Sequence, residues 1–131
     1  MKDDLSRTGG TGPATWTSTY TYDAVGRLVE AVIPHHDLTY GFASTSSCGV
    51  NTHAGLDGNR TSMSDVKDGG TAFSTSYCYD NADRLTSSVS VNAPAGVDPV
   101  NAGLPATSIV YDGHGNTTTL ADQSLGYNEA D

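Results

Sequence analysis

The sequence Tyr20-Thr21-Tyr22-Asp23-Ala24-Val25-Gly26-Arg27-Leu28 decides the fold of this chain. Tyr20 and Tyr22 are two residues apart, so they point to the same face of a strand. Asp23 and Gly26 take the first and fourth positions of a four-residue turn. There an Asp carboxylate accepts a backbone N–H, and glycine adopts a positive φ without steric cost. A second strand runs from the turn to about Ile33, so the stretch predicts a β-hairpin.

The same pattern returns along the chain, once in full and three times in part. The full copy is Tyr77-Cys78-Tyr79-Asp80-Asn81-Ala82-Asp83-Arg84-Leu85. The partial copies are Leu56-Asp57-Gly58-Asn59-Arg60-Thr61, Tyr111-Asp112-Gly113-His114-Gly115-Asn116-Thr117 and Tyr127-Asn128-Glu129-Ala130-Asp131. Two copies depart from the pattern, because Asp83 replaces the glycine and no tyrosine precedes Asp57. Asp tolerates the left-handed region better than most residues, at a cost of about 1 kcal/mol.

These units resemble the YD repeats of the RHS/YD-repeat family. In that family a Tyr-Asp-x-x-Gly-Arg-Leu half alternates with a Gly-Asn-Arg or Gly-Asn-Thr half. The chain shows this alternation in order: Gly26-Arg27-Leu28, Gly58-Asn59-Arg60, Asp83-Arg84-Leu85 and Gly115-Asn116-Thr117. The resemblance implies a structural role for the signature residues. They are Tyr20, Tyr22, Asp23, Gly26, Arg27, Leu28, Asp57, Gly58, Asn59, Arg60, Tyr77, Tyr79, Asp80, Asp83, Arg84, Leu85, Tyr111, Asp112, Gly115, Asn116 and Tyr127.

The resemblance also implies a function. Long YD arrays coil into hollow shells, which enclose a toxic C-terminal domain in bacterial polymorphic toxins and insecticidal toxin complexes and form extracellular scaffolds in teneurins. We therefore expect a secreted or cell-surface bacterial protein that encapsulates or presents another domain, with no catalysis of its own. About four hairpins cannot close a shell, so open strand edges should pair with another copy or continue a partner's sheet.

The alternative is an extracellular module that binds a glycan or a protein through exposed tyrosines and the loop 92–106. The tyrosines can stack on sugars, or on one another between strands, and the second arrangement is the commoner use of cross-strand aromatic residues.

Composition favours an all-β fold: a strip of consecutive antiparallel hairpins forming one curved open sheet. Glycine is abundant, with 15 residues, and lysine and glutamate are scarce. The net charge of −9 and the absence of a basic stripe argue against nucleic-acid binding. No run approaches the roughly 20 apolar residues of a membrane span, and the charged start Met1-Lys2-Asp3-Asp4 is unlike a signal peptide.

The chain divides into a flexible N-terminal arm, residues 1–14, and a hairpin array, residues 15–131. The arm is polar and glycine-rich. Period-2 patterns predict strands at 15–22, 27–33, 38–42, 71–79, 85–91, 108–112 and 117–120, with loops at 35–37 and 65–70. The segment 92–106, rich in Pro, Gly and Ala, is predicted to be a functional or mobile loop.

No catalytic, metal or cofactor site is predicted. No Gly-x-Ser-x-Gly pattern occurs, and the glycines fall at turns and not before a helix. His35 and His36 are adjacent on an extended chain and point to opposite sides, so they rarely share one metal ion. Cys48 and Cys78 can form a disulfide in an extracellular protein, closing a loop of about thirty residues. Two free thiols are the alternative.

Overall fold

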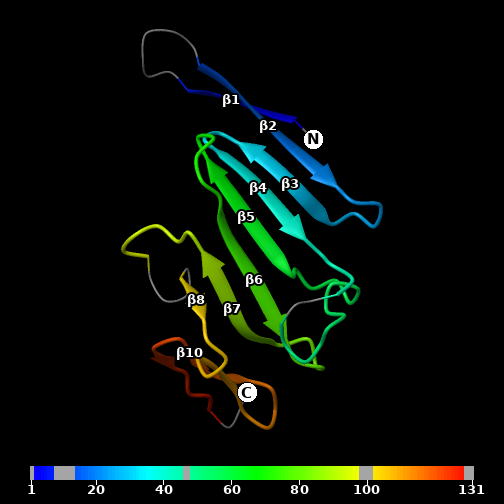
Figure 1. The fold of residues 1–131 in the computed structure, drawn as a ribbon, viewed down its shortest axis with the longest axis vertical. Helices are drawn as coiled ribbons and strands as arrows, with labels where there is room; N and C mark the ends of the chain where they lie inside the picture. The colour runs from blue at the N-terminus through cyan, green and yellow to red at the C-terminus, as the bar shows by residue number, and fades with distance from the viewer. Residues whose placement is uncertain (1, 8–13, 46–47, 98–101, 129–131) are drawn as a thin grey trace.

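The fold is a strip of antiparallel strands, with no helix in the part of the chain that the structure describes. The structure is a computed structural model that describes residues 2–7, 14–45, 48–97 and 102–128, and only the backbone of 2–7 and 14–16. Eight strands form one sheet in chain order: β1 (Lys2–Arg7), β2 (Ala14–Tyr22), β3 (Leu28–Ile33), β4 (His36–Gly41), β5 (Ser62–Lys67), β6 (Phe73–Tyr79), β7 (Leu85–Val91) and β8 (Gly103–Leu104) (Figure 1). A second sheet has the order β11 (Gln123–Ser124), β10 (Thr117–Leu120), β9 (Ile109–Tyr111).

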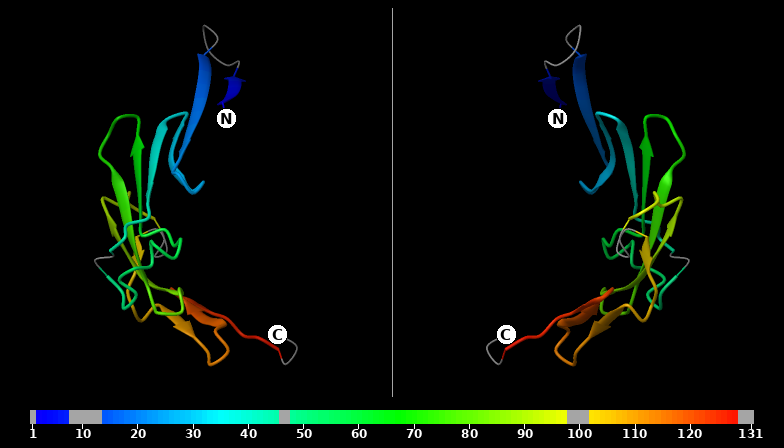
Figure 2. Two further views of the ribbon diagram at one scale, coloured as in Figure 1. Left: turned by 90° about the vertical axis from the view of Figure 1, so that its right-hand side faces the viewer. Right: turned by 90° about the vertical axis from the view of Figure 1, so that its left-hand side faces the viewer.

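The strip is curved and open. Figure 2 shows it as an arc, with β1 and β2 at one end and the β9–β11 sheet at the other, both turning toward the same side. The two ends do not meet, so the sheets are not closed into a barrel. The predicted fold class, an all-β strip of antiparallel hairpins in a curved open sheet, is confirmed.

The main sheet has an apolar face and a polar face. Cross-strand partners share a face, and the register places Tyr20 opposite Ala31, Ala31 opposite Leu38, and Tyr40 opposite Met63 on the apolar face. The other face carries many serines and threonines together with exposed valines. The buried apolar residues are small or scattered, namely Ala31, Ala54, Cys78, Leu104 and Ile109. The apolar face is therefore only partly covered, because a single layer lacks the second layer that normally closes a core.

Several segments differ from the sequence-based prediction. Residues 2–7 form β1, paired with β2, where the sequence suggested a flexible arm; residues 8–13 of that arm lie outside the described residues. An edge strand can be held by backbone hydrogen bonds alone, so the polar composition of these residues did not indicate a strand. Residues 65–67 belong to β5 and His36 begins β4, although both were predicted to lie in loops. Within 92–106, Gly103 and Leu104 pair with β7 as β8, and residues 98–101 lie outside the described part.

Candidate functional site

Four turns lie in a row at one end of the strands, and we call them the turn row: residues 23–26, 55–58, 80–83 and 112–115. The first turn shows the design. One carboxylate oxygen of Asp23, Oδ1, accepts the amides of Val25 (3.0 Å) and Arg27 (2.9 Å), while Oδ2 accepts the Nε of Arg27 at 2.7 Å. Gly26 donates its N–H to the carbonyl of Asp23 and has a φ of 86°. A single carboxylate therefore organises the whole turn.

The third and fourth turns repeat these bonds. Oδ1 of the first residue again accepts the amides two and four positions later, each at 2.9 Å. Oδ2 accepts the side chain of the fifth residue, Arg84 at 2.8 Å and Asn116 at 3.1 Å. The fourth residue again has a positive φ, 59° at Asp83 and 94° at Gly115. Three separate segments thus adopt one hydrogen-bonded unit, as expected of a true repeat.

The second turn begins two residues earlier than the sequence pattern predicted. The first position is Gly55 and not Asp57, because the Gly58 amide donates to the Gly55 carbonyl at 3.3 Å. Asp57 is therefore the third residue of its turn, and the tyrosine position belongs to Ala54, which is fully buried. A Cβ at Gly55 would fall on the backbone of Ala43. This unit lacks both the tyrosine and the aspartate because Ala54 and Gly55 pack closely against other segments and leave no room for larger side chains.

The irregular residue Asp83 has a role of its own. Its carboxylate accepts the side-chain amides of Asn51 at 2.9 Å and Asn59 at 2.8 Å. Asn51 also donates to Asp57 at 3.2 Å. A glycine at position 83 would favour the turn but would leave these amides without that partner. The aspartate thus links the second and third turns, which offsets its positive φ.

Three tyrosine hydroxyls each bond to the backbone of the preceding unit; the second unit, with Ala54 at the tyrosine position, has no such bond. Tyr79 donates to the carbonyl of Arg60 at 2.8 Å, Tyr111 to that of Leu85 at 2.6 Å and Tyr127 to that of Thr117 at 2.9 Å. Tyr79 and Tyr111 directly precede the first position of a turn, and all three acceptors directly follow the fifth turn position of the preceding unit. These bonds form a repeated joint between neighbouring units.

Arginine–aromatic stacking accompanies these joints. The guanidinium carbon of an arginine lies over a ring of another segment at a centroid distance of 4.3 to 4.7 Å. The pairs are Arg27 with Phe42, Arg60 with Tyr40 and Arg84 with Tyr111. Such cation–π contacts contribute on the order of 0.5–1 kcal/mol each at exposed sites. All three arginines therefore pack units together, and Arg27 and Arg84 also close turns.

We expect Tyr111→Phe to lower the free energy of unfolding by about 1 kcal/mol, since it removes one partly buried hydrogen bond and keeps the ring. Tyr22→Phe is the matched control. Tyr22 occupies the same place in the first unit, but it is 54 % exposed and its hydroxyl bonds to none of the described residues. Urea unfolding of both variants measures the difference. Equal losses would contradict a joint made by the hydroxyl.

The turn carboxylates are held ionised. The Arg27 amide, followed by the Arg27 guanidinium, lowers the pKa of Asp23 below its usual 3.8. At Asp80 partial burial is the largest influence and raises the pKa, but the hydrogen bonds from Arg84 and Ala82 outweigh it, so the pKa is again lowered. Asp112 behaves in the same way. A lowered pKa contributes stability above the usual value of about 3.9, and this is lost as the pH falls through the lowered pKa.

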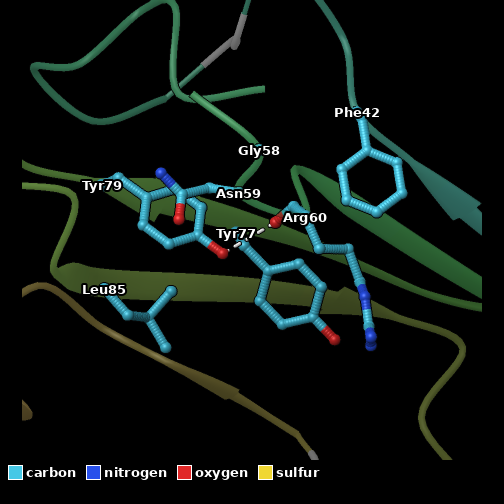
Figure 3. A pocket seen from close by; sticks show the side chains of 7 residues that line it. All are labelled: Phe42, Gly58, Asn59, Arg60, Tyr77, Tyr79 and Leu85. Carbon is cyan, nitrogen blue, oxygen red and sulfur yellow. Dashed lines mark hydrogen bonds between the residues drawn. The ribbon is translucent and has the colours of Figure 1, made fainter. Parts of the chain in front are cut away.

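A pocket lies beside the second and third turns. Its cavity volume is about 390 Å³, and Figure 3 shows the lining residues: Phe42, Gly58, Asn59, Arg60, Tyr77, Tyr79 and Leu85. Arg60, Tyr77, Tyr79, Asn59, Gly58 and Leu85 were singled out as repeat residues. The sequence did not indicate that they would line an open hollow, nor that Phe42 would join them. The pocket forms because the long segment between β4 and β5 folds back beside β6.

The remaining candidate residues have structural partners. Cys48 and Cys78 form a disulfide, with Cα atoms 5.1 Å apart. His36 Nδ1 lies 2.8 Å from Asp65, and His35 Nδ1 lies 2.6 Å from Asp68. The two adjacent imidazoles thus face different carboxylates. Among the described residues, no three His, Cys, Asp or Glu side chains gather closely enough to hold a metal ion.

No helix in the described part of the chain is long and apolar enough to cross a membrane. Comparison of the chain with family models, curated proteins and solved structures found no match in any of the three. A functional interpretation therefore rests on the geometry of the turn row, the open sheet and the pocket.

Proposed function

We propose that this chain is a structural assembly module: a segment of an RHS/YD-repeat β-shell or fibre that encapsulates or presents another domain and has no catalysis of its own. The observation that carries the proposal is the joint between units. A tyrosine hydroxyl bonds to the same backbone position of the preceding unit at three successive places. Such a joint can be repeated indefinitely, as an extended array requires.

The open sheet supports the same proposal. In the described part of the chain its apolar face is only partly covered, and the strip has free edges at β1 and β11. A free edge offers unpaired backbone N–H and C=O groups to another strand. Tyr22 adds a specific feature at the β1 end, because its hydroxyl finds no partner among the described residues while its counterparts do. Further units, or further copies, would satisfy these groups.

A secreted or cell-surface location, and an enclosed toxin domain in a parent protein, are part of this proposal. The family resemblance carries both. The disulfide between Cys48 and Cys78 favours an oxidising compartment, since such bonds are rare where thiols are kept reduced.

The alternative, a binding module using tyrosines and the loop 92–106, has less support. Tyr79, Tyr111 and Tyr127 already donate their hydroxyls to the backbone. The loop 92–106 contributes no residue to the pocket beside the second and third turns, and only Leu104 to a second hollow that Tyr77 also lines. An assembly role is consistent with these bonds, because in that role the tyrosines connect neighbouring units.

The test is the mass in solution, measured by light scattering after size exclusion over a concentration series. We expect the mass to rise with concentration, and Ser124→Pro to reduce that rise. Leu125 donates its amide to Thr118, and Ser124 lies opposite Thr119. Along an antiparallel edge strand, successive backbone N–H groups point alternately toward and away from the neighbouring strand. The Leu125 amide points toward β10, so the Ser124 amide points away from it. Proline removes that outward donor without breaking a bond to β10.

Ser124→Ala is the matched control, because it removes the same hydroxyl but keeps the amide. It should assemble like the wild type. A monomer of constant mass up to millimolar concentration would contradict edge-to-edge assembly. An equal effect of alanine and proline would show that the β11 edge is not the working surface.

A further inference from the structure

Arg60 differs from the other turn-row arginines. Arg27 and Arg84 each pair with an aspartate at 2.7 Å. The turn before Arg60 has Gly55 at its first position and Asn59 at its fifth, so it supplies no such carboxylate. The Arg60 side chain forms no ion pair or hydrogen bond with any described residue, and it stacks on the Tyr40 ring at 4.4 Å. Its guanidinium is thus ordered by a ring and still has its donors available.

The guanidinium stands at a pocket that has both polar and apolar walls. Phe42, Tyr77 and Leu85 provide two rings and a branched aliphatic side chain. Figure 3 shows the Arg60 side chain beside the Tyr77 ring, with the guanidinium and the Tyr77 hydroxyl at the same end. That hydroxyl has no hydrogen-bond partner among the described residues. A cavity of about 390 Å³ lies within the range of small-molecule sites, which combine apolar walls with a few polar groups.

Carboxylates of the protein itself are engaged elsewhere. Four lie on elements adjoining the pocket, and each has a partner other than Arg60: Asp57 with Asn51, Asp65 with His36, Asp80 with Arg84, and Asp83 with Asn51 and Asn59. An arginine can bind a carboxylate through two parallel hydrogen bonds, which a lysine cannot do. The Arg60 guanidinium can therefore bind an anion that comes from outside the protein.

We propose that this pocket binds a small ring compound that carries a carboxylate. The carboxylate pairs with the Arg60 guanidinium and accepts the Tyr77 hydroxyl, and the ring packs against Phe42, Tyr77 and Leu85. The site lies in the middle of the strip, away from the β1 and β11 edges, so binding is independent of the proposed assembly. The net charge of −9 disfavours anions, so any preference for an acid over its neutral analogue must come from Arg60.

The test uses two matched probe pairs, glucuronate with glucose and benzoate with benzamide, titrated into the ¹⁵N-labelled full chain. In at least one pair we expect the acid to bind at least tenfold more tightly than its neutral partner. The shifted amides should cluster at residues 58–60 and 77–79. Preference for glucuronate would identify acidic sugars as the ligand source, and preference for benzoate would identify aromatic acids.

Arg60→Gln should weaken acid binding at least tenfold and leave the Tyr79 hydroxyl its backbone acceptor. Lys67→Gln is the matched control, since it removes the same charge from an exposed position on β5. It should leave binding unchanged. An unchanged amide spectrum away from the pocket shows that Arg60→Gln is folded. Absence of binding by every probe, equal binding of acids and neutral partners, or equal effects of the two variants would each overturn the proposal.

Discussion

Replacing Gly55 by aspartate is expected to destabilise the protein by about 3 kcal/mol, although it restores the repeat pattern. Aspartate organises the other turns from this position, as at Asp23. In this unit, however, a Cβ would fall on the carbonyl oxygen of Ala43 and lie 2.7 Å from the carbonyl carbon of Phe42. Both are backbone atoms, which cannot move aside as the end of a flexible side chain does. Urea unfolding measures the loss.

Two controls separate the steric effect from the charge. Gly55→Ala should cause most of the same loss, because the conflict begins at the Cβ. Gly113→Ala adds the same methyl group inside the fourth turn, where nothing lies within 4 Å of it, and should be close to neutral. A Gly55→Asp protein as stable as the wild type would show that the second unit can take the repeat geometry, and would contradict the close packing of Gly55 against Ala43.

The turns and hairpins could be predicted because their determinants are local. An Asp carboxylate reaches amides only two and four residues away, and a period-2 pattern shows the face of a strand without knowledge of its neighbour. The strands β2, β3, β6 and β7 accordingly appear close to where the sequence placed them.

The second unit was misaligned because its local signal fits two positions. Asp57-Gly58-Asn59 looks like a reduced Tyr-Asp-Gly copy, and only the hydrogen bonds from Gly58 and Asn59 place Gly55 first. The backbone of Ala43 excludes a side chain at position 55. Ala43 lies in a segment whose sequence shows no periodic pattern, so this contact could not be predicted.

Long-range partners were also beyond prediction. The tyrosine hydroxyls donate to backbone carbonyls. Every residue has such a carbonyl, so the sequence cannot indicate which one is the acceptor. Asn51 carries no motif, yet it bonds to Asp83 and Asp57. The pocket depends on the same folding back of residues 42–61, so its residues were recognised singly but not as a site.

Replacing both cysteines by alanine is expected to lower the free energy of unfolding by about 3 kcal/mol. The disulfide joins residues 30 positions apart and closes a loop that contains the second turn and β5. Opening such a loop gives the unfolded chain more freedom. Alanine is preferred to serine because Cys78 is only 2 % exposed, and a serine hydroxyl there would be buried. Urea unfolding of the variant, and of the wild type in reductant, should give the same midpoint.

Hydrogen exchange separates two ways in which the disulfide can act. A purely unfolded-state effect lowers protection equally for all amides that exchange by global unfolding. The structure predicts an additional local loss, because the disulfide lies next to Gly49, which bridges to Tyr79, and the Asn51 amide donates to the Tyr79 carbonyl at 3.0 Å. The Asn51 and Asn59 amides should therefore lose more protection than those of β2 and β3. Equal losses throughout would mean that the hydrogen bonds of this segment hold it against β6 without the disulfide.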